Sequence, residues 1–203
     1  MKKYKNIIFD VGNVLFRYRW ADMLIDYGMD PAAAQSFGKM LFEDSADLWR
    51  IYDMGTMSDE ALTEVYVERY PQAEKELRWF FAHGEYLHIA LHRAWDALHQ
   101  LKAAGYRIYL LSNYAESLFR KHTEYADFMK DLDGMMVSYM IHRAKPDREI
   151  YHALYEKYSL DPAECLFFDD RAENVEASRA TGMDAFQVTS EDDLIRFIHE
   201  NLL

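Results

Sequence analysis

The sequence has a single cysteine, few basic residues relative to acidic ones, and no long apolar run. Cys165 cannot form an intramolecular disulfide, and its neighbours Leu166 and Phe167 are typical of a buried strand rather than of a reactive thiol. Lys and Arg together number 23 against 35 Asp and Glu, which gives a net charge of −12. Because nucleic acids and anionic lipid surfaces attract basic proteins, this balance argues against a nucleic-acid partner and against a membrane partner.

The first apolar run is too short to span a membrane. It ends at Asp10, so it forms neither a signal peptide nor an anchor, and the cytoplasm is the expected location. Internal repeats and low-complexity linkers are also absent from the sequence. With 203 residues and 50% hydrophobic composition, the chain is long enough for one domain, or for one domain that carries a sizeable insertion.

Short apolar runs alternate with segments of helical periodicity along most of the chain. We predict buried strands over residues 5–10, 106–111, 135–138, 166–168 and 185–188. We predict helices over residues 87–104, 116–130, 148–158 and 173–181, and from residue 191 onward. This alternation, with right-handed crossovers, predicts an α/β fold with a doubly wound parallel sheet.

Helical periodicity interrupts the alternation directly after the first strand. Gly28 is expected to end one helix, Asp30 with Pro31 to begin the next, and Ser58 to cap a further one. Four aromatic side chains of this segment are expected to form its own core. They are Trp20, Trp49, Tyr52 and Trp79.

This helical segment is expected to be an insertion that lies over the edge of the sheet. We therefore predict a core domain of residues 1–16 and 87–203 and an all-helical cap domain of residues 17–86. An insertion at this point of the chain would cover the end of the first strand, where Asp10 lies. Such a segment is a candidate lid.

Polar side chains follow the predicted strands, at the carboxyl end of each strand or just beyond it. In an open α/β sheet these ends share one edge, where ligands bind. Adjacent carboxylates after a buried strand repel each other unless a cation or hydrogen bonds offset their charge. Carboxylate oxygens suit Mg²⁺, which completes its coordination with water and substrate phosphate. The residues concerned are Asp10, Ser112, Asn113, Lys145, Asp169 and Asp170.

Together these residue types favour phosphoryl transfer. An Asp beside Mg²⁺ and a lysine can attack phosphorus and form an aspartyl phosphate, which water then cleaves; Asp10 is the candidate. Ser112, Asn113 and Lys145 would donate hydrogen bonds to the phosphoryl oxygens. Each signal also has a structural interpretation, because acids at strand ends cap helices, Ser-Asn suits a turn, and a Lys-Pro loop can simply be solvated.

Four motifs, in this order, resemble those of the haloacid dehalogenase-like hydrolases, and the resemblance runs through almost the entire chain. It implies a Rossmann-like core with the helical cap of subfamily IA. By this resemblance, Asp10 is the nucleophile and a metal ligand, and Asp170 is a direct metal ligand. The motifs are FDVGNVL at residues 9–15, LLSN at 110–113, KPD at 145–147 and FDDRAENVEA at 168–177.

The resemblance also implies roles for the other residues at this edge. Ser112 binds the phosphoryl group, and Lys145 tethers that group to the nucleophile. Asp169 completes the acidic metal site, and Asn174 supports it. The cofactor is Mg²⁺, which also takes the main-chain oxygen of Gly12.

Gly12 is a departure from the family pattern. Most phosphatases of the family have an Asp at this position, which protonates the leaving group and then activates water. General acid catalysis is typically worth roughly 10²- to 10⁴-fold, so we expect a preference for good leaving groups, such as an anomeric sugar phosphate, or a proton donor from the cap, the substrate or water. The Gly-Asn-Val form of the first motif resembles a subgroup that includes α-D-glucose-1-phosphate phosphatase.

Two other functions stay open at this point. Family members that cleave carbon–halogen bonds without a metal also lack an Asp at this position, but the adjacent acids Asp169 and Asp170 disfavour halide release. A binding module that keeps the fold without catalysis is the second alternative. The expected partner is a small phosphorylated metabolite, and the oligomeric state is open.

Overall fold

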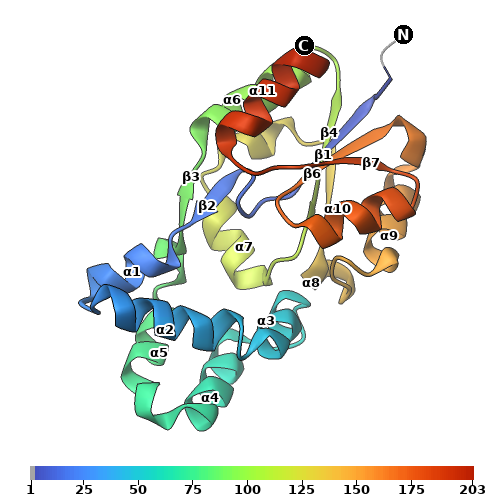
Figure 1. The fold of residues 1–203 in the computed structure, drawn as a ribbon. Coiled ribbons are helices and arrows are strands. Elements are labelled where there is room, and N and C mark those ends of the chain that lie inside the picture. Colours follow the sequence, from blue (N-terminus) through green and yellow to red (C-terminus); the bar gives the residue numbers. More distant parts are fainter. Residues whose placement is uncertain (1–2) are drawn as a thin grey trace.

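The computed structural model describes residues 3–203, and a five-stranded parallel sheet forms its centre (Figure 1). Each predicted strand is confirmed to within one residue at either end. The spatial order is β5-β4-β1-β6-β7. The strands are β1 (Asn6–Phe9), β4 (Arg107–Ser112), β5 (Gly134–Val137), β6 (Cys165–Asp169) and β7 (Asp184–Gln187).

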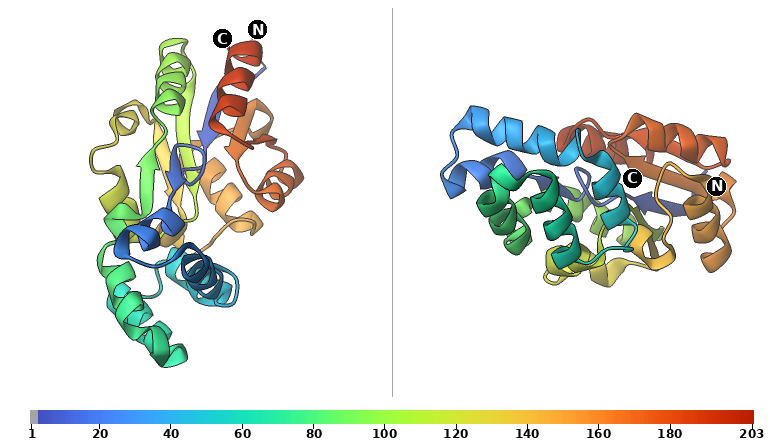
Figure 2. Two further views of the ribbon diagram at one scale, coloured as in Figure 1. Left: turned by 60° about the vertical axis from the view of Figure 1, so that its left-hand side comes forward. Right: turned by 90° about the horizontal axis from the view of Figure 1, so that it is seen from below.

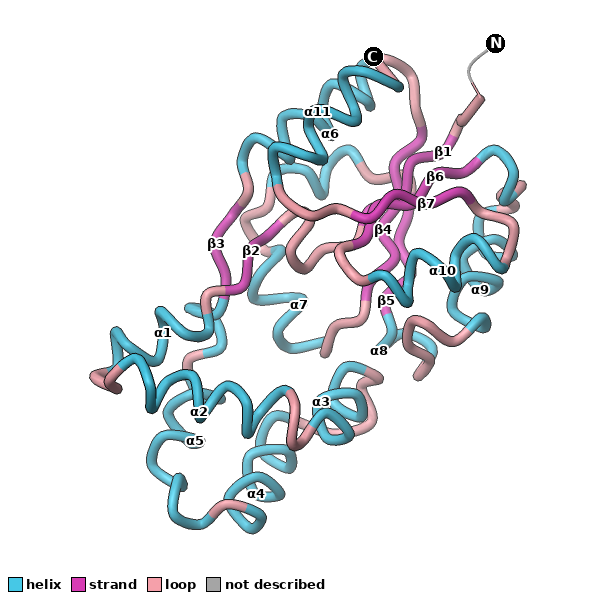
Figure 3. The backbone as a smooth tube through the Cα atoms, in the orientation of Figure 1, coloured by secondary structure: helices cyan, strands magenta, loops and turns pink. Residues whose placement is uncertain are grey.

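Side chains along the strands alternate between two apolar layers, as a pleated sheet requires. Ile8 and Phe167 point into the layer covered by α9 (Arg148–Tyr158) and α10 (Ala172–Ala180). Ile7 and Phe168 point into the opposite layer, covered by α6 (His92–Ala103) and α11 (Glu191–Asn201). Helices on both faces confirm the doubly wound arrangement (Figure 3).

The parallel register brings the carboxyl ends of the three middle strands to one edge of the sheet. Phe9 of β1 lies opposite Leu110 of β4 and Phe168 of β6. The polar residues that come next on the three strands are therefore neighbours at this edge. They are Asp10, Ser112 and Asp169.

A two-stranded antiparallel ribbon connects the sheet to the helical segment. Its strands are β2 (Phe16–Tyr18) and β3 (His88–Ala90). The prediction was wrong here, because it placed residues 87–91 in a helix that in fact begins at His92. The strand conformation of these residues depends on pairing between segments about seventy residues apart. Local periodicity cannot predict such pairing.

The α-helices α1 to α5 lie beyond the ribbon, on the side of the carboxyl edge (Figure 1 and Figure 2). Their predicted caps are confirmed: Gly28 is left-handed with φ 111°, Asp30 accepts hydrogen bonds from two main-chain N–H groups, and Ser58 accepts one from Ala61. The helices are α1 (Trp20–Tyr27), α2 (Pro31–Phe42), α3 (Ala46–Asp53), α4 (Asp59–Arg69) and α5 (Glu74–Ala82).

The helix predicted over residues 116–130 is shorter than expected. It divides into α7 (Glu116–Thr123) and a 3₁₀ turn (Asp127–Asp131). The break lets Phe128 turn fully into the core, where its ring meets Trp95. A short helix after β5, α8 (Ser138–Ile141), was not predicted. Within residues 3–203, no helix is long and apolar enough to cross a membrane.

The buried layer predicts where a truncation is costly. We expect Ile108→Ala, on β4 and fully buried, to lower the free energy of unfolding by about 2–5 kcal/mol, because it leaves a cavity under α6. Ile25→Ala, on α1 with 40% of the side chain exposed, should change it by less than about 1 kcal/mol. Urea denaturation measures both, and equal effects would contradict the assignment of the core.

Candidate active site

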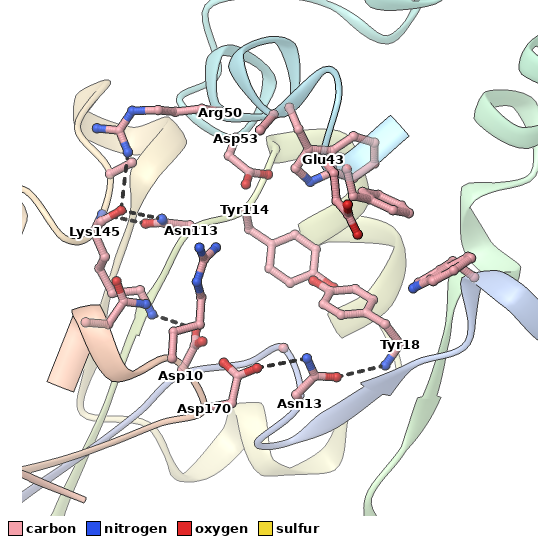
Figure 4. A pocket seen from close by; sticks show the side chains of 18 of the residues that line it. Asp10, Asn13, Tyr18, Glu43, Arg50, Asp53, Asn113, Tyr114, Lys145 and Asp170 are labelled. Atoms are coloured by element: carbon pink, nitrogen blue, oxygen red, sulfur yellow. Dashed lines mark hydrogen bonds and ion pairs between the residues drawn. The ribbon is translucent and has the colours of Figure 1, made fainter. Parts of the chain in front are cut away.

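A cavity of about 610 Å³ lies between the carboxyl edge of the sheet and helices α2 and α3 (Figure 4). The sheet side contributes Asp10, Asn113, Lys145 and Asp170. Each of these follows a strand, or the loop after one, so the parallel topology accounts for their convergence. All of the residues that the sequence predicted for the site therefore meet around this one cavity or directly beneath it.

Lys145 is the centre of the charged network. Its Nζ lies 2.9 Å from Asp10 Oδ1 and 2.6 Å from Asp169 Oδ2, and its side chain is completely buried. Burial by itself would lower the pKa of Lys145, but the two carboxylates outweigh this effect and raise that pKa. The side chain is therefore an ammonium that holds two strand ends together.

Asp10 is positioned by the residues on either side of β1. Its Oδ1 accepts a hydrogen bond of 2.7 Å from Ser112 Oγ, in addition to the contact with Lys145. Burial raises the pKa of Asp10, and the ammonium of Lys145 opposes that rise. Both contacts fall on one oxygen, which leaves Oδ2 available to a ligand in the cavity.

The two adjacent acids after β6 have different surroundings. Asp169 is completely buried, and it accepts hydrogen bonds from Lys145, from the Arg171 main chain and from the Asn174 amide. Asp170 faces the cavity and accepts a hydrogen bond of 2.9 Å from the Asn13 amide. Asp169 is thus suited to a supporting position, and Asp170 is the acid free to meet a ligand.

The acids can hold a metal ion. One carboxylate oxygen from each of Asp10, Asp169 and Asp170 lies within 4.8 Å of the other two. Burial raises the pKa of Asp170, and the negative charge of Asp169 adds to that rise, so a bound cation would favour the ionised carboxylate. Such a set of hard oxygen donors fits Mg²⁺.

Gly12 lines the cavity beside the ring of Tyr18. The chain turns directly after it, where Asn13 is left-handed with φ 55°. A Cβ at position 12 would lie 2.6 Å from Tyr18 Cε2, so a larger residue there would displace the ring. The tyrosine ring occupies the space of a side chain next to Asp10.

Asn113 holds the lysine loop. Its Oδ1 accepts a hydrogen bond of 2.7 Å from the Lys145 N–H, and its Nδ2 donates a hydrogen bond of 2.9 Å to the Lys145 carbonyl. We expected its amide or its main-chain N–H to donate to a phosphoryl group. Because the loop uses both polar atoms of the amide, the main-chain N–H is the candidate that stays a prediction.

The helical side of the cavity contributes polar residues in addition to those predicted at the strand ends. Asp53, at the end of α3, points into the cavity, and Tyr18 lies across from it (Figure 4). Arg50, three residues before Asp53, donates to the Lys145 carbonyl and to Asp147. The i, i+3 spacing places Arg50 and Asp53 on one helix face, a signal that becomes useful only once the orientation of α3 is known.

The aromatic residues of the helical segment divide between two surroundings. Tyr52 is buried, and Trp79 packs on Tyr27, as expected of a core. Trp20 and Trp49 also line the cavity, together with Phe42. One wall of the site is therefore aromatic.

Comparison with known proteins identifies relatives of this arrangement. A family model described as haloacid dehalogenase-like hydrolase matches residues 4–182. Sesquiterpene phosphatase astK of Aspergillus oryzae is 24% identical, over 92% of this chain and 90% of that protein. A HAD family enzyme of Bacteroides thetaiotaomicron, crystallised with magnesium and inorganic phosphate, has a TM-score of 0.72 at 20% identity and covers 92% of this chain and 95% of its own. L-2-haloacid dehalogenase of Xanthobacter autotrophicus has a TM-score of 0.70 at 17% identity, and the match covers 98% of this chain and 84% of the dehalogenase.

The buried network predicts a large effect of removing its cation. We expect Lys145→Met to lower the free energy of unfolding at pH 8 by about 3–5 kcal/mol, because two buried carboxylates lose their partner. The loss should shrink as the pH falls, since burial raises the pKa of Asp10 and a protonated Asp10 carboxyl needs no ammonium. Urea denaturation at pH 8 and pH 5 measures it.

The control for this prediction is the double variant Lys145→Met with Asp169→Asn. Replacing one carboxylate by a neutral amide removes part of the uncompensated charge, so the double variant should be more stable than Lys145→Met alone at pH 8. A single variant as stable as the natural protein at pH 8 would show that the network contributes little.

Proposed function

The chain belongs to the haloacid dehalogenase-like hydrolase family, and from this membership we propose that it is a magnesium-dependent phosphatase that cleaves a small phosphate monoester through an aspartyl phosphate on Asp10. The observation that carries the proposal is the set of three carboxylates gathered beside one buried ammonium at the floor of the cavity. The names of the relatives support it, because one is a phosphatase and another was crystallised with magnesium and phosphate.

Asp10 would attack phosphorus through the oxygen that its protein contacts leave available. Ser112 Oγ and Lys145 Nζ lie on the other oxygen and hold the carboxylate in place. Lys145 and the main-chain N–H groups after β4 would balance the charge of the phosphoryl oxygens. Asp10, Asp170 and the Gly12 carbonyl would hold Mg²⁺ with Asp169 behind them, and the bound ion would neutralise charge on the transferring group.

The metal-independent dehalogenase is disfavoured by the same carboxylates. Asp170 presents a negative charge to the cavity, where a 2-haloacid would bring its own carboxylate and release a halide. The likeness to a haloacid dehalogenase structure concerns the fold, which both activities share.

The helical side of the cavity would select the alcohol of the ester. We propose that residues 17–86 act as a cap over a core of residues 1–16 and 87–203, and that the alcohol is a sugar, held by polar groups such as Arg50 and Asn13. A second candidate is an ester of an apolar alcohol. The aromatic wall of Trp20, Phe42 and Trp49 favours it, as does the name of the sesquiterpene phosphatase.

Phosphate release tests the proposal directly. We expect release from α-D-glucose 1-phosphate, from farnesyl phosphate, or from both, with Mg²⁺ present and not with excess EDTA. Asp10→Asn should reduce the rate by at least about 10³-fold, because it removes the nucleophile. Asp22→Asn, an exposed position on α1, is the matched control and should keep the rate.

The ratio of the two rates identifies the substrate class. Faster turnover of the sugar ester supports the polar alcohol, and faster turnover of the prenyl ester supports the apolar one. Halide release from 2-chloropropionate in the presence of EDTA, with no phosphate release from either ester, would replace the phosphatase by the dehalogenase.

A further inference from the structure

Position 12, two residues after the nucleophile Asp10, does not carry a proton donor. Gly12 has no side chain, and the ring of Tyr18 lies where one would project, with Tyr18 Oη 3.1 Å from the place of a Cβ. An acid for the leaving group must therefore come from elsewhere around the cavity. The opposite wall provides a carboxyl group.

That carboxyl belongs to Asp53, the last residue of α3. Its side chain is partly buried and points into the cavity toward the carboxyl edge (Figure 4). The main-chain N–H of Ala115, at the start of α7, also lies within hydrogen-bonding reach of the carboxylate. The group is therefore inside the site and held against the core.

The end of α3 is anchored to the core by its main chain as well. The Asp53 carbonyl accepts a short hydrogen bond from Ser138 Oγ, and the Met54 carbonyl accepts 2.7 Å from His142 Nδ1. Gly55, which follows, lies against Tyr139 so closely that a Cβ there would be 2.7 Å from Tyr139 Cβ. These contacts hold the main chain at the end of α3 against the core.

The surroundings of Asp53 suit proton transfer near neutral pH. Burial, and then the negative charge of Asp10, raise the pKa of Asp53 to about 7. A carboxyl with a pKa near the working pH can both donate and accept a proton. The other ionisable groups that interact electrostatically with it are Lys145, Arg171, Tyr18, Tyr52 and Tyr114.

We propose that Asp53 is a catalytic acid and base, a role that rests on the proposed phosphatase function. As Asp10 Oδ2 bonds to phosphorus and the bond from phosphorus to the ester oxygen breaks, the Asp53 carboxyl gives its proton to that oxygen and an alcohol leaves. Asp53, now a carboxylate, takes a proton from water as the water oxygen bonds to phosphorus and the bond from phosphorus to Asp10 Oδ2 breaks. Inorganic phosphate leaves, and both aspartates return to their starting states.

Tyr18 is the competing donor, and its surroundings are less suitable. Its hydroxyl is tied to Tyr114, whose hydroxyl in turn contacts His122 Nδ1 at 2.6 Å. Burial holds the pKa of Tyr18 well above its usual value of about 10. A tyrosine of that kind holds its proton tightly and is a poorer donor to the leaving oxygen near neutral pH than a carboxyl whose pKa lies close to the working pH.

The test is the dependence of kcat/KM on the leaving group, with Mg²⁺ present, for p-nitrophenyl phosphate and an alkyl phosphate. A p-nitrophenolate anion can leave without being protonated, whereas an alkoxide leaves readily only when it receives a proton. Asp53→Asn should therefore lower kcat/KM by roughly 10²- to 10⁴-fold for the alkyl ester and by only a few fold for p-nitrophenyl phosphate. Asp53→Asn should also release nitrophenol in a burst. Without the base at Asp53, hydrolysis of the aspartyl phosphate becomes the slow step, so the intermediate accumulates after the first turnover.

The controls separate this role from a structural one. Asp47→Asn makes the same change on a solvent-exposed part of α3 and should leave both rates unchanged. An equal loss for both esters in Asp53→Asn, or no loss, would overturn the proposal. It would also be overturned if Tyr18→Phe, and not Asp53→Asn, lost kcat/KM selectively for the alkyl ester. Absence of phosphate release by the natural protein from every ester would overturn the phosphatase function itself, and this role with it.

Discussion

The site depends on one interaction, the contact of the buried Lys145 ammonium with Asp10 and Asp169. A charge removed from water is costly unless it is fully paired, and two carboxylates on neighbouring strands supply that pairing. The same contact keeps the ends of β1 and β6 together although both carry negative charge. Asn113 and Arg50 then hold the main chain of the lysine, so the position of the ammonium is determined from two sides.

This arrangement connects the helical segment to the chemistry of the sheet. Arg50 reaches from α3 to the Lys145 carbonyl and to Asp147, in the loop that carries the lysine. The end of the same helix is bonded to Ser138 and His142, which follow β5. Any movement of α3 away from the sheet would therefore loosen the lysine loop and withdraw Asp53 at the same time.

The sequence predicts the parts of this structure that local patterns determine. The parallel strands follow from short apolar runs, and the convergence of Asp10, Ser112 and Asp169 follows from parallel topology, because each residue comes at or after a strand end. The ribbon of β2 and β3 and the orientation of α3 depend on contacts between distant segments, so the sequence gives no sign of either. The contact of Gly12 with the ring of Tyr18 also depends on the ribbon, because Tyr18 is the last residue of β2. The site roles and the domain boundaries stay predictions.

A proton donor on α3 has a different consequence from one beside the nucleophile. An acid at position 12 would be ready whenever the core is folded, whereas Asp53 is in place only while α3 lies against the core. The nucleophile could then react with a poor leaving group only in the closed arrangement, in which the cavity walls also contact the alcohol. Recognition of the alcohol and its protonation would thus come from the same helix. Selectivity would be expressed in the rate of bond cleavage as well as in binding, because the wrong alcohol would leave the acid out of place.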